Sequence, residues 1–430
     1  MAKSTGRRVA IIGGLRTPFV KANTVFNDLS ALDLGVAVVK ELVQRYELEP
    51  SMVDQLVFGQ VIPGLTAASV AREVVLLSGL PPSLEAHTVA RACATSIQAM
   101  VSAANAIALG QADVAIAGGT ESMSDPPIFT TRALAHALVS ASKAKNLRDK
   151  IMPFQGLKAK DLLPVPPAIA EYTTGLSMGE SAEKMAKENG VTRARQDEIA
   201  LSSHQNAARA WKVGLFKDEV MTVPVPPKYE TLADRDTLVR EDTTLEALGQ
   251  LKPVFDRTYG SVTAGNASPL TDGAAALLLM SEERARELGY EPLGFLRAHA
   301  FAATDPADQL LQGPAYAVPL ALDRAGMSLA DVDLIDMHEA FAVQVASNLQ
   351  ALASAAFAKK LGRSAPVGEV DPSRLNVNGG SIALGHPFAA TGARLVHQSL
   401  RELKRRHLGT ALITVCAQGG QGAAVILERS

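Results

Sequence analysis

The chain alternates short apolar stretches with longer segments in which apolar residues recur at helical spacing. The short stretches, several of which end in glycine or a polar turn, predict strands at residues 9–12, 55–58, 114–117, 334–337 and 411–415. The longer segments predict helices at residues 30–46, 96–109, 319–325 and 392–406. Such an alternation is typical of an α/β protein with buried sheets.

The order of these elements repeats along the chain. In the first half a helix leads into residues 52–59, and in the second half another helix leads into residues 329–338. A helix and strand bounded by glycine then follow in each half, at 96–119 and 391–420. We therefore expect two similar α/β halves.

Residues 125–253 interrupt the repeat with proline-rich turns and no strand rhythm, which predicts an inserted and mostly helical excursion. Its first part gathers cations against a single acid, Asp149; the cations are Arg132, Lys143, Lys145, Arg148, Lys150, Lys158 and Lys160. Two interpretations stay open. The cations form a solvated helical face, or they form a docking surface for phosphate groups, a partner chain or a membrane.

Composition narrows the class of protein. With 430 residues, 47% hydrophobic and 20% charged, the chain can bury a large core. The 42 basic and 44 acidic residues nearly cancel, which argues against a nucleic-acid binder as a whole. No apolar run reaches the roughly 18 residues of a membrane-spanning helix. Neither a signal peptide nor a peroxisomal address is evident, and two cysteines are too few for a disulfide framework. A cytoplasmic protein is expected.

Cys93 is the first candidate for chemistry. A helical apolar pattern begins directly after it, with Ile97, Met100 and Val101. Cys93 therefore falls at a helix N-terminus, where free N–H groups and the helix dipole are expected to lower the pKa of its thiol. The same N–H groups could bind an oxyanion on an attached acyl group. The alternative is an inert buried cysteine.

His386 lies in a glycine-rich stretch at residues 378–392. The spacing of Gly380 and Gly385 imitates a phosphate loop, but the lysine and hydroxyl residue of such a loop are replaced by His386 and Pro387. Nucleotide binding is therefore disfavoured, and the glycines are expected to allow close backbone approach around a fixed imidazole that takes a proton from a thiol. The alternative is a solvent-exposed loop histidine.

Two further candidates follow strands. Cys416 ends an apolar strand beside a glycine-rich turn, where it could exchange protons in thiol chemistry or merely fill the core. His338 and Glu339 follow the strand at 334–337, at the edge where α/β sheets place ligands. Two cysteines and two histidines could suggest zinc, but no two of them are close in sequence, so no metal site is expected.

Taken together, these segments resemble the thiolase family over essentially the whole chain. The matching stretches, in order, are Arg16 to Phe19, Cys93 to Ser96, Gly118 to Met123, Val262 to Gly273, His338 to Phe341, Gly385 to Pro387 and Cys416 to Gly422. The resemblance implies a thiolase fold of two βαβ-type halves in five α-β-α-β-α layers, with an inserted loop domain over the coenzyme A site and an obligate dimer. The domains would be 1–124 with 254–285, the insertion 125–253, and 286–430.

The resemblance also implies roles for residues. Cys93 would take the acyl group, His386 would activate it, and Cys416 would move the proton on the α-carbon or on incoming coenzyme A. His338, with a bound water, and His386 would hold the thioester oxygen, while N–H groups at Cys93 and near Gln418 would hold the other oxygen. The positions that line the pantetheine and acyl pocket in relatives are matched by Met178, Ala264, Ser268 and Phe341. Coenzyme A would be a substrate, and no other cofactor is expected.

Two departures refine the resemblance. Many thiolases have asparagine where this chain has His338, and the His338-Glu339-Ala340-Phe341 stretch looks like that of the thiolase subunits of multienzyme fatty-acid oxidation complexes. This implies cleavage of 3-ketoacyl-CoA in β-oxidation and an α2β2 complex with a hydratase/dehydrogenase subunit. Gln418 stands where glycine is usual, and a positive φ there would strain it.

Several alternatives stay open beside this interpretation. Elongating condensing enzymes share the fold and use one cysteine with two histidines, but they do not need Cys416. A cysteine hydrolase would also leave Cys416 unexplained. A biosynthetic acetoacetyl-CoA thiolase differs only in its acyl pocket and direction. A non-catalytic thiolase-like lipid carrier would be expected to lack a catalytic residue, and none is missing.

Overall fold

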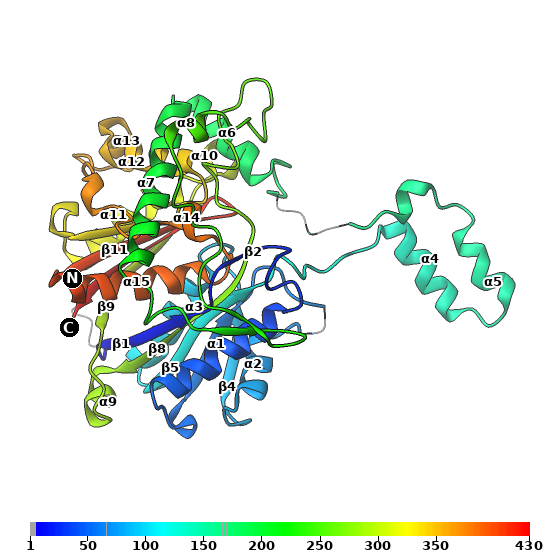
Figure 1. Cartoon of the computed structure of the whole chain (residues 1–430), viewed down its shortest axis with the longest axis horizontal. Helices are drawn as coiled ribbons and strands as arrows, with labels where there is room; N and C mark the ends of the chain where they lie inside the picture. The colour runs from blue at the N-terminus through cyan, green and yellow to red at the C-terminus, as the bar shows by residue number, and fades with distance from the viewer. Residues whose placement is uncertain (1–5, 66, 166, 168–169) are drawn as a thin grey trace. The chain divides into compact units, whose positions relative to one another are not determined.

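The computed structural model describes residues 6–65, 67–165, 167 and 170–430. The chain forms two compact units (Figure 1). The larger unit comprises Met1–Val61, Ser69–Asp125 and Ala170–Ser430, and the smaller unit comprises Ile62–Ala68 and Pro126–Ile169. The three-domain boundaries expected from the sequence stay a prediction.

Five strands of the larger unit form the first half-sheet. They are β1 (Val9–Arg16), β3 (Gln55–Gly59), β4 (Glu85–Val89), β5 (Val114–Glu121) and β8 (Thr271–Ser281), in the order β4-β3-β5-β8-β1. Strand β3 is parallel to β4 and β5, whereas β8 is antiparallel to β5 and β1. A short strand, β2 (Val20–Lys21), also pairs with β8.

The second half-sheet repeats this arrangement. It consists of β9 (Gly294–Ala303), β10 (Leu334–Met337), β11 (Thr410–Ala417) and β12 (Gln421–Arg429), in the order β10-β11-β12-β9. Strands β10 and β11 are parallel and the other pairs are antiparallel, as in β3-β5-β8-β1. The place of β4 is marked by Leu375, which forms a parallel bridge to Ile335. The prediction of two similar halves is confirmed.

The two half-sheets join edge to edge. Ala10 and Ile11 of β1 pair with Phe295 and Gly294 of β9, which makes one ten-stranded sheet. This junction is short, so the two halves can turn their faces toward a shared set of helices.

Those helices complete five layers. Helices α3 (Thr95–Ala108) and α15 (Thr391–Arg406) form one buried cluster with strands of both halves, and they lie between the half-sheets in Figure 1. Helices α1 (Ala31–Arg45) and α2 (Val70–Ser78) cover the outer face of the first half, and α11 (Gly313–Ala325) covers that of the second. The five-layered thiolase fold expected from the resemblance is therefore confirmed.

Alternation along the strands explains why they are apolar throughout. In β8, Leu277 and Leu279 face the central cluster, while Leu278 and Met280 face α1 and α2. A strand covered on both faces needs apolar residues at every position, so it reads as a continuous hydrophobic run. All eleven residues of β8 are buried.

The predicted elements fall close to those observed. All five predicted strands and the helices α1, α3 and α15 are present at the expected places. The helix predicted at 319–325 begins earlier, at Gly313, and Pro319 lies inside it. Proline is favoured in the first turn of a helix, and the prediction placed Pro319 there. In the structure Pro314 occupies the first turn instead.

The remaining elements of the larger unit surround this core. They are α6 (Met178–Glu188), α7 (Arg193–Lys212), β6 (Val223–Val225), β7 (Thr231–Ala233), α8 (Leu245–Gly249), α9 (Glu282–Glu287), α10 (Pro306–Gln309), α12 (Ala342–Ala353), α13 (Ala355–Lys360) and α14 (Ser381–Leu384). Helix α7 packs on both α12 and α14, so the excursion reaches the loops that carry the candidate residues. None of the helices in the described ranges combines the length and apolarity needed to cross a membrane.

The smaller unit holds the cation-rich segment. It contains α4 (Arg132–Lys143) and α5 (Leu147–Ile151), and its ends are joined by a bridge between Phe129 and Val165. It also exposes large apolar side chains: Ile128, Phe129, Leu138, Val139, Leu147, Ile151, Met152, Phe154, Leu162, Leu163 and Val165. A merely solvated cationic face does not account for so many exposed apolar groups.

Candidate active site

Cys93 lies in a tight turn between β4 and α3. The turn is closed by Thr95, whose Oγ1 accepts from the Arg91 N–H (2.8 Å) and donates to the Ala92 carbonyl (2.7 Å). Ala92 has a φ of 42°, the left-handed region that costs a non-glycine residue about 1–2 kcal/mol. This strained turn places the next residue, Cys93, just before the first turn of α3.

The pKa of the Cys93 thiol is raised from 9.0 to about 12, chiefly because burial disfavours the thiolate. N–H groups of Cys93 and Gln418 act in the opposite direction but are outweighed. The expectation of a lowered pKa at this helix start is therefore wrong, because the partial charge of a helix end is smaller than the cost of burying a thiolate. The thiol needs a base to react at neutral pH.

His386 supplies a buried imidazole, not an exposed loop side chain. It is 3% exposed, and its Nδ1 lies 2.6 Å from Thr391 Oγ1. Thr391 Oγ1 in turn donates to the Pro387 carbonyl (3.2 Å). The His386 Nε2 has no hydrogen-bond partner in the described part of the chain. Burial, followed by the charge of Arg394, lowers the His386 pKa to about 3.

His338 lies directly beside His386. It follows β10, it is fully buried, and the two ring centroids are 4.0 Å apart. The His338 Nδ1 is 2.8 Å from Ser381 Oγ, and its Nε2 finds no partner among the described residues. Burial, His386 and Arg394 hold the His338 pKa well below 6.5, so both rings are neutral.

These residues converge although they are distant in sequence. The Cys93 Sγ and one ring nitrogen each of His338 and His386 lie within 4.8 Å of one another. The fold therefore brings three possible metal donors together from segments that are far apart in the sequence, so sequence spacing alone does not exclude a metal site here. That the site works without a metal stays a prediction.

Cys416 approaches the same place from β11. It is fully buried and pairs across the hairpin with Gly422. Its side chain belongs to an apolar cluster with Val262 and Phe341. Burial, and then repulsion from Cys93, raise the Cys416 pKa well above 9.0. Cys416 is thus close enough to Cys93 for their charges to interact.

The turn after Cys416 accommodates Gln418 without strain. The positive φ angles fall on Gly419 (82°) and Gly420 (69°), and Gln418 is not among the described non-glycine residues with positive φ. Its backbone N–H is directed toward Cys93. Its side-chain Nε2 donates to the Ala170 carbonyl (2.8 Å), which anchors the turn. The glutamine is therefore compatible with an N–H donor at this position.

The expected pocket residues divide into two groups. Met178 at the start of α6 and Phe341 pack in the apolar cluster that contains Cys416. Ser268 donates its N–H to the Ala340 carbonyl (2.9 Å), beside Phe341, whereas Ala264 is exposed on the preceding turn.

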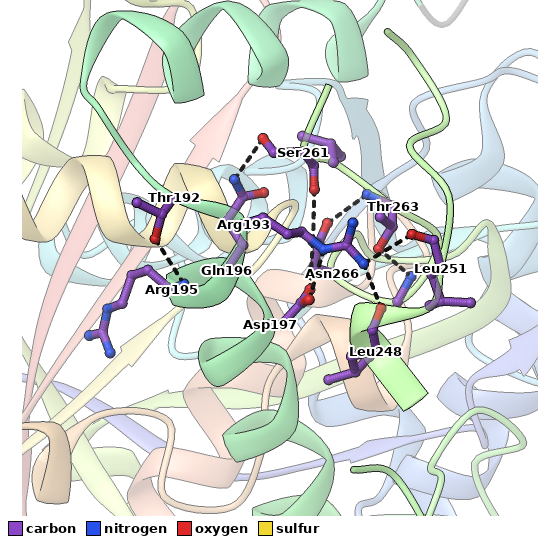
Figure 2. Close-up of polar contacts among 12 residues, drawn as sticks. Thr192, Arg193, Arg195, Gln196, Asp197, Leu248, Leu251, Ser261, Thr263 and Asn266 are labelled. Atoms are coloured by element: carbon purple, nitrogen blue, oxygen red, sulfur yellow. Dashed lines mark hydrogen bonds and ion pairs between the residues drawn. The ribbon is translucent and has the colours of Figure 1, made fainter. Parts of the chain in front are cut away.

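A polar network that the sequence did not reveal fastens that turn to α7 (Figure 2). Arg193 Nε donates to Asp197 Oδ2 (2.7 Å), and Asn266 Nδ2 donates to Asp197 Oδ1 (3.0 Å). Asn266 Oδ1 accepts from the Thr263 N–H (2.8 Å), and its backbone carbonyl accepts from the Ala342 N–H (2.9 Å). The network thus links α7 to the loop that follows His338.

Glu339 organises the glycine-rich loop. Its buried carboxylate accepts from Ser203 Oγ (2.6 Å), Asn376 Nδ2 (2.6 Å) and the Ile382 N–H (3.2 Å). A Cβ at Gly380 would lie 2.1 Å from the Glu339 Cδ. Gly380 is therefore required for close approach to a carboxylate, in line with the interpretation that rejected a phosphate loop.

A partly buried thiol, a neutral imidazole and N–H donors meet on a duplicated α/β fold, and these are the groups that acyl transfer through a cysteine requires. The chain belongs to the thiolase family: the model described as "Thiolase, N-terminal domain" matches residues 9–283, and "Thiolase, C-terminal domain" matches residues 290–429.

Individual relatives agree with the family assignment. A 3-ketoacyl-CoA thiolase of Serratia proteamaculans is 55% identical over 98% of this chain and 97% of its own length. One from a Shewanella species is 52% identical over 100% of this chain and 98% of its own. Among solved structures, the Bacillus anthracis acetyl-CoA acetyltransferase has a TM-score of 0.84 and human mitochondrial 3-ketoacyl-CoA thiolase 0.83. Both are 32% identical; the former covers 100% of both chains and the latter 99%.

Proposed function

We propose that the chain catalyses the thiolysis of 3-ketoacyl-CoA by coenzyme A, which yields acetyl-CoA and an acyl-CoA shortened by two carbons, in fatty-acid β-oxidation. The observation that carries the proposal is the convergence of the Cys93 thiol with two neutral imidazoles within 4.8 Å. The identities of 55% and 52% to full-length relatives named 3-ketoacyl-CoA thiolase support the substrate class.

In the first half-reaction, Cys93 attacks the 3-keto carbon while His386 Nε2 takes the thiol proton. The bond between C2 and C3 then breaks, and its electrons pass to the thioester, which becomes an enolate. His338 and His386 are placed to stabilise that enolate oxygen. Cys416 protonates C2, and acetyl-CoA leaves. The acyl group remains on Cys93 as a thioester.

In the second half-reaction, the Cys416 thiolate takes the proton of incoming coenzyme A. The coenzyme A thiolate attacks the acyl-Cys93 carbonyl, whose oxygen is stabilised by the N–H groups of Cys93 and Gln418. Cys93 leaves and recovers its proton from His386. A second buried thiol beside Cys93 supports thiolysis over hydrolysis or chain elongation, because neither of those reactions needs it.

The second candidate is a biosynthetic acetoacetyl-CoA thiolase, which is favoured by the structural likeness to an acetyl-CoA acetyltransferase. The deciding experiment measures thiolysis rates on 3-ketoacyl-CoA substrates from four to sixteen carbons. We expect cleavage of the longer chains. Activity confined to the four-carbon substrate supports the biosynthetic alternative, and no activity with an intact fold supports a lipid carrier.

We further propose a cytoplasmic homodimer that assembles with a hydratase/dehydrogenase subunit into an α2β2 complex. The exposed apolar and cationic side chains of the smaller unit support a docking role. Co-expression with such a subunit and co-purification test this, with Leu147→Asp and Ile151→Asp as disrupting variants. A stable lone homodimer of undiminished activity counts against the complex, and binding to anionic vesicles instead indicates a membrane role.

A further inference from the structure

Two adjacent imidazoles in the site are held by hydroxyl groups that differ in their other partners. Each ring places Nδ1 on a hydroxyl: His386 on Thr391 and His338 on Ser381. Each ring leaves its Nε2 without a partner in the described chain. Thr391 Oγ1 donates to a carbonyl, whereas Ser381 Oγ receives a hydrogen bond from Arg394 Nη2 (3.1 Å).

The single hydrogen of Thr391 determines the form of His386. That hydrogen points to the Pro387 carbonyl, so Thr391 Oγ1 can only accept from the imidazole. The His386 Nδ1 therefore carries the ring hydrogen, and its Nε2 presents a lone pair. His386 is fixed as a base.

The hydroxyl of Ser381 has the opposite arrangement. A guanidinium only donates, so the hydrogen bond from Arg394 uses a lone pair of Ser381 Oγ. No acceptor other than His338 Nδ1 faces that hydroxyl among the described residues. The Ser381 hydrogen therefore points to Nδ1, and the ring hydrogen of His338 lies on Nε2.

We propose that Ser381, backed by Arg394, positions His338 as an Nε2–H donor while Thr391 keeps its neighbour His386 as an Nε2 base. The assignment rests on the proposed function, in which His338 donates to the enolate oxygen of a coenzyme A thioester. Neither ring changes charge to acquire its role. Two identical side chains, 4.0 Å apart, thus perform opposite tasks.

The surroundings of Ser381 support a positioning role. Ser381 begins α14, and the next residue, Ile382, donates its N–H to the Glu339 carboxylate. The Glu339 carboxylate therefore anchors the first turn of α14, which carries the Ser381 hydroxyl that contacts His338. The buried charge of Arg394 also lowers the pKa of both rings, which keeps the neutral tautomers populated.

The test reads tautomers directly, by two-dimensional ¹⁵N–¹H NMR of the full chain labelled with ¹⁵N-histidine. His338→Asn and His386→Asn assign the two rings. We expect the hydrogen on Nε2 of His338 and on Nδ1 of His386. A His338 that carries its hydrogen on Nδ1, or that is charged at neutral pH, overturns the proposal. Because this readout needs no turnover, it is decided even if the chain proves inactive toward 3-ketoacyl-CoA.

Kinetics then separate positioning from mere packing. Ser381→Ala should lower kcat about 10- to 100-fold with KM little changed, and shift the His338 signals toward a tautomer mixture. Ser381→Thr, which keeps the hydroxyl, should restore both. In a His338→Asn background the amide donates without help, so Ser381→Ala should add no further loss of kcat.

Ser281→Ala is the matched control, because Ser281 is also buried and also accepts from an arginine, Arg7 (2.7 Å), but caps α9 instead. It should leave the tautomers and kcat unchanged. If Ser381→Ala lowers kcat equally in the wild-type and His338→Asn backgrounds, Ser381 is a packing residue and the proposal is wrong. If Ser381→Ala does not fold, the wild-type tautomers and Ser381→Thr still decide the proposal.

Discussion

The Cys93 Sγ and a ring nitrogen of His386 lie within 4.8 Å of each other, and each residue precedes one of the two helices of the central layer. Cys93 comes before α3 in the first half, and His386 comes before α15 in the second. Since α3 and α15 pack together between the half-sheets, their N-terminal ends bring the two residues together. The duplication thus supplies the proposed nucleophile from one half and the proposed base from the other.

Substitution of the two cysteines should separate the half-reactions. Cys93→Ser should abolish both thiolysis and acyl labelling, since a hydroxyl is far less acidic than the thiol that His386 serves. Cys416→Ala should still gain the acyl mass on Cys93, although more slowly, and should turn over poorly, because C2 loses its proton donor and coenzyme A loses its proton acceptor. Intact-mass spectrometry after mixing with substrate and steady-state rates measure both effects. Full activity in Cys93→Ala would refute the mechanism.

The raised pKa of Cys93 predicts an unusual alkylation profile without substrate. With a thiol pKa of about 12, the thiolate fraction should rise about tenfold per pH unit between about pH 7 and pH 10. The rate of iodoacetamide labelling at Cys93, followed by peptide mass spectrometry, should therefore keep climbing over this range. A plateau near neutral pH would instead show a low-pKa thiolate at the helix start. Thr95→Ser keeps the hydroxyl that closes the turn around Cys93, so as a control it should show the same pH profile.

The sequence predicts the layers of this fold well, because the layers follow from the spacing of apolar residues and from the order of helices and strands along the chain. Strands such as β10 and β11 are buried on both faces and leave a continuous apolar signal. The sequence also indicates Cys93 and His386 as candidate site residues, because they lie at the boundaries of helices and loops. The pKa values of these two residues, in contrast, depend chiefly on burial, which the residues around each position in the sequence do not reveal.

The residues that the sequence did not single out act through tertiary contacts. Ser381 and Arg394 appear ordinary until the fold places one hydroxyl between a guanidinium and His338. Asp197 and Asn266 are likewise polar residues whose partners come from distant segments. Such pairs have no local period or spacing, so no pattern in one sequence indicates them.

Buried neutral histidines should make the folded protein less stable in acid. His397 is the residue chosen to measure this loss of stability. Burial and then nearby arginines lower its pKa to about 3, against about 6.5 when unfolded. As the pH falls, His397 therefore binds a proton in the unfolded chain before it does so in the folded one. The contribution of neutral His397 to the free energy of unfolding is intact above about pH 6.5 and is lost as the pH falls toward 3. Between about pH 8 and pH 5 the loss is about 2 kcal/mol.

The measurement compares wild type with His397→Gln by urea unfolding at several pH values. Wild type should lose about 2 kcal/mol more than the variant over that window. Parallel pH profiles for the two proteins would show that His397 is not buried in its neutral form.

The donor cluster at Cys93 predicts that zinc inhibits the enzyme, whereas the proposed mechanism predicts that the enzyme needs no zinc for activity. Zn²⁺ prefers thiolate and imidazole ligands, and three such donors lie within 4.8 Å. Micromolar Zn²⁺ should therefore inhibit thiolysis by capturing Cys93, and EDTA should reverse this while leaving untreated enzyme fully active. Loss of activity on chelation alone, with restoration by a metal, would contradict the metal-free mechanism.

The Asp197–Asn266 hydrogen bond should control the shape of the coenzyme A pocket. Asn266→Asp places a second carboxylate against the buried Asp197, while Arg193 still pairs with only that one acid. An uncompensated buried charge costs about 3–5 kcal/mol, so the melting temperature should fall clearly. Because Asn266 also holds Thr263 and Ala342, KM for coenzyme A should rise more than kcat falls.

Asn266→Ala, which removes the amide without adding charge, is the matched control. It leaves one Asp197 oxygen unpaired and should cost about 1–3 kcal/mol. Calorimetry and steady-state kinetics on both variants test the order of these effects. If Asn266→Asp is as stable as Asn266→Ala, the added carboxylate does not carry the expected cost of a buried charge and the prediction is wrong. If neither variant changes KM, the network supports the fold without shaping the pocket.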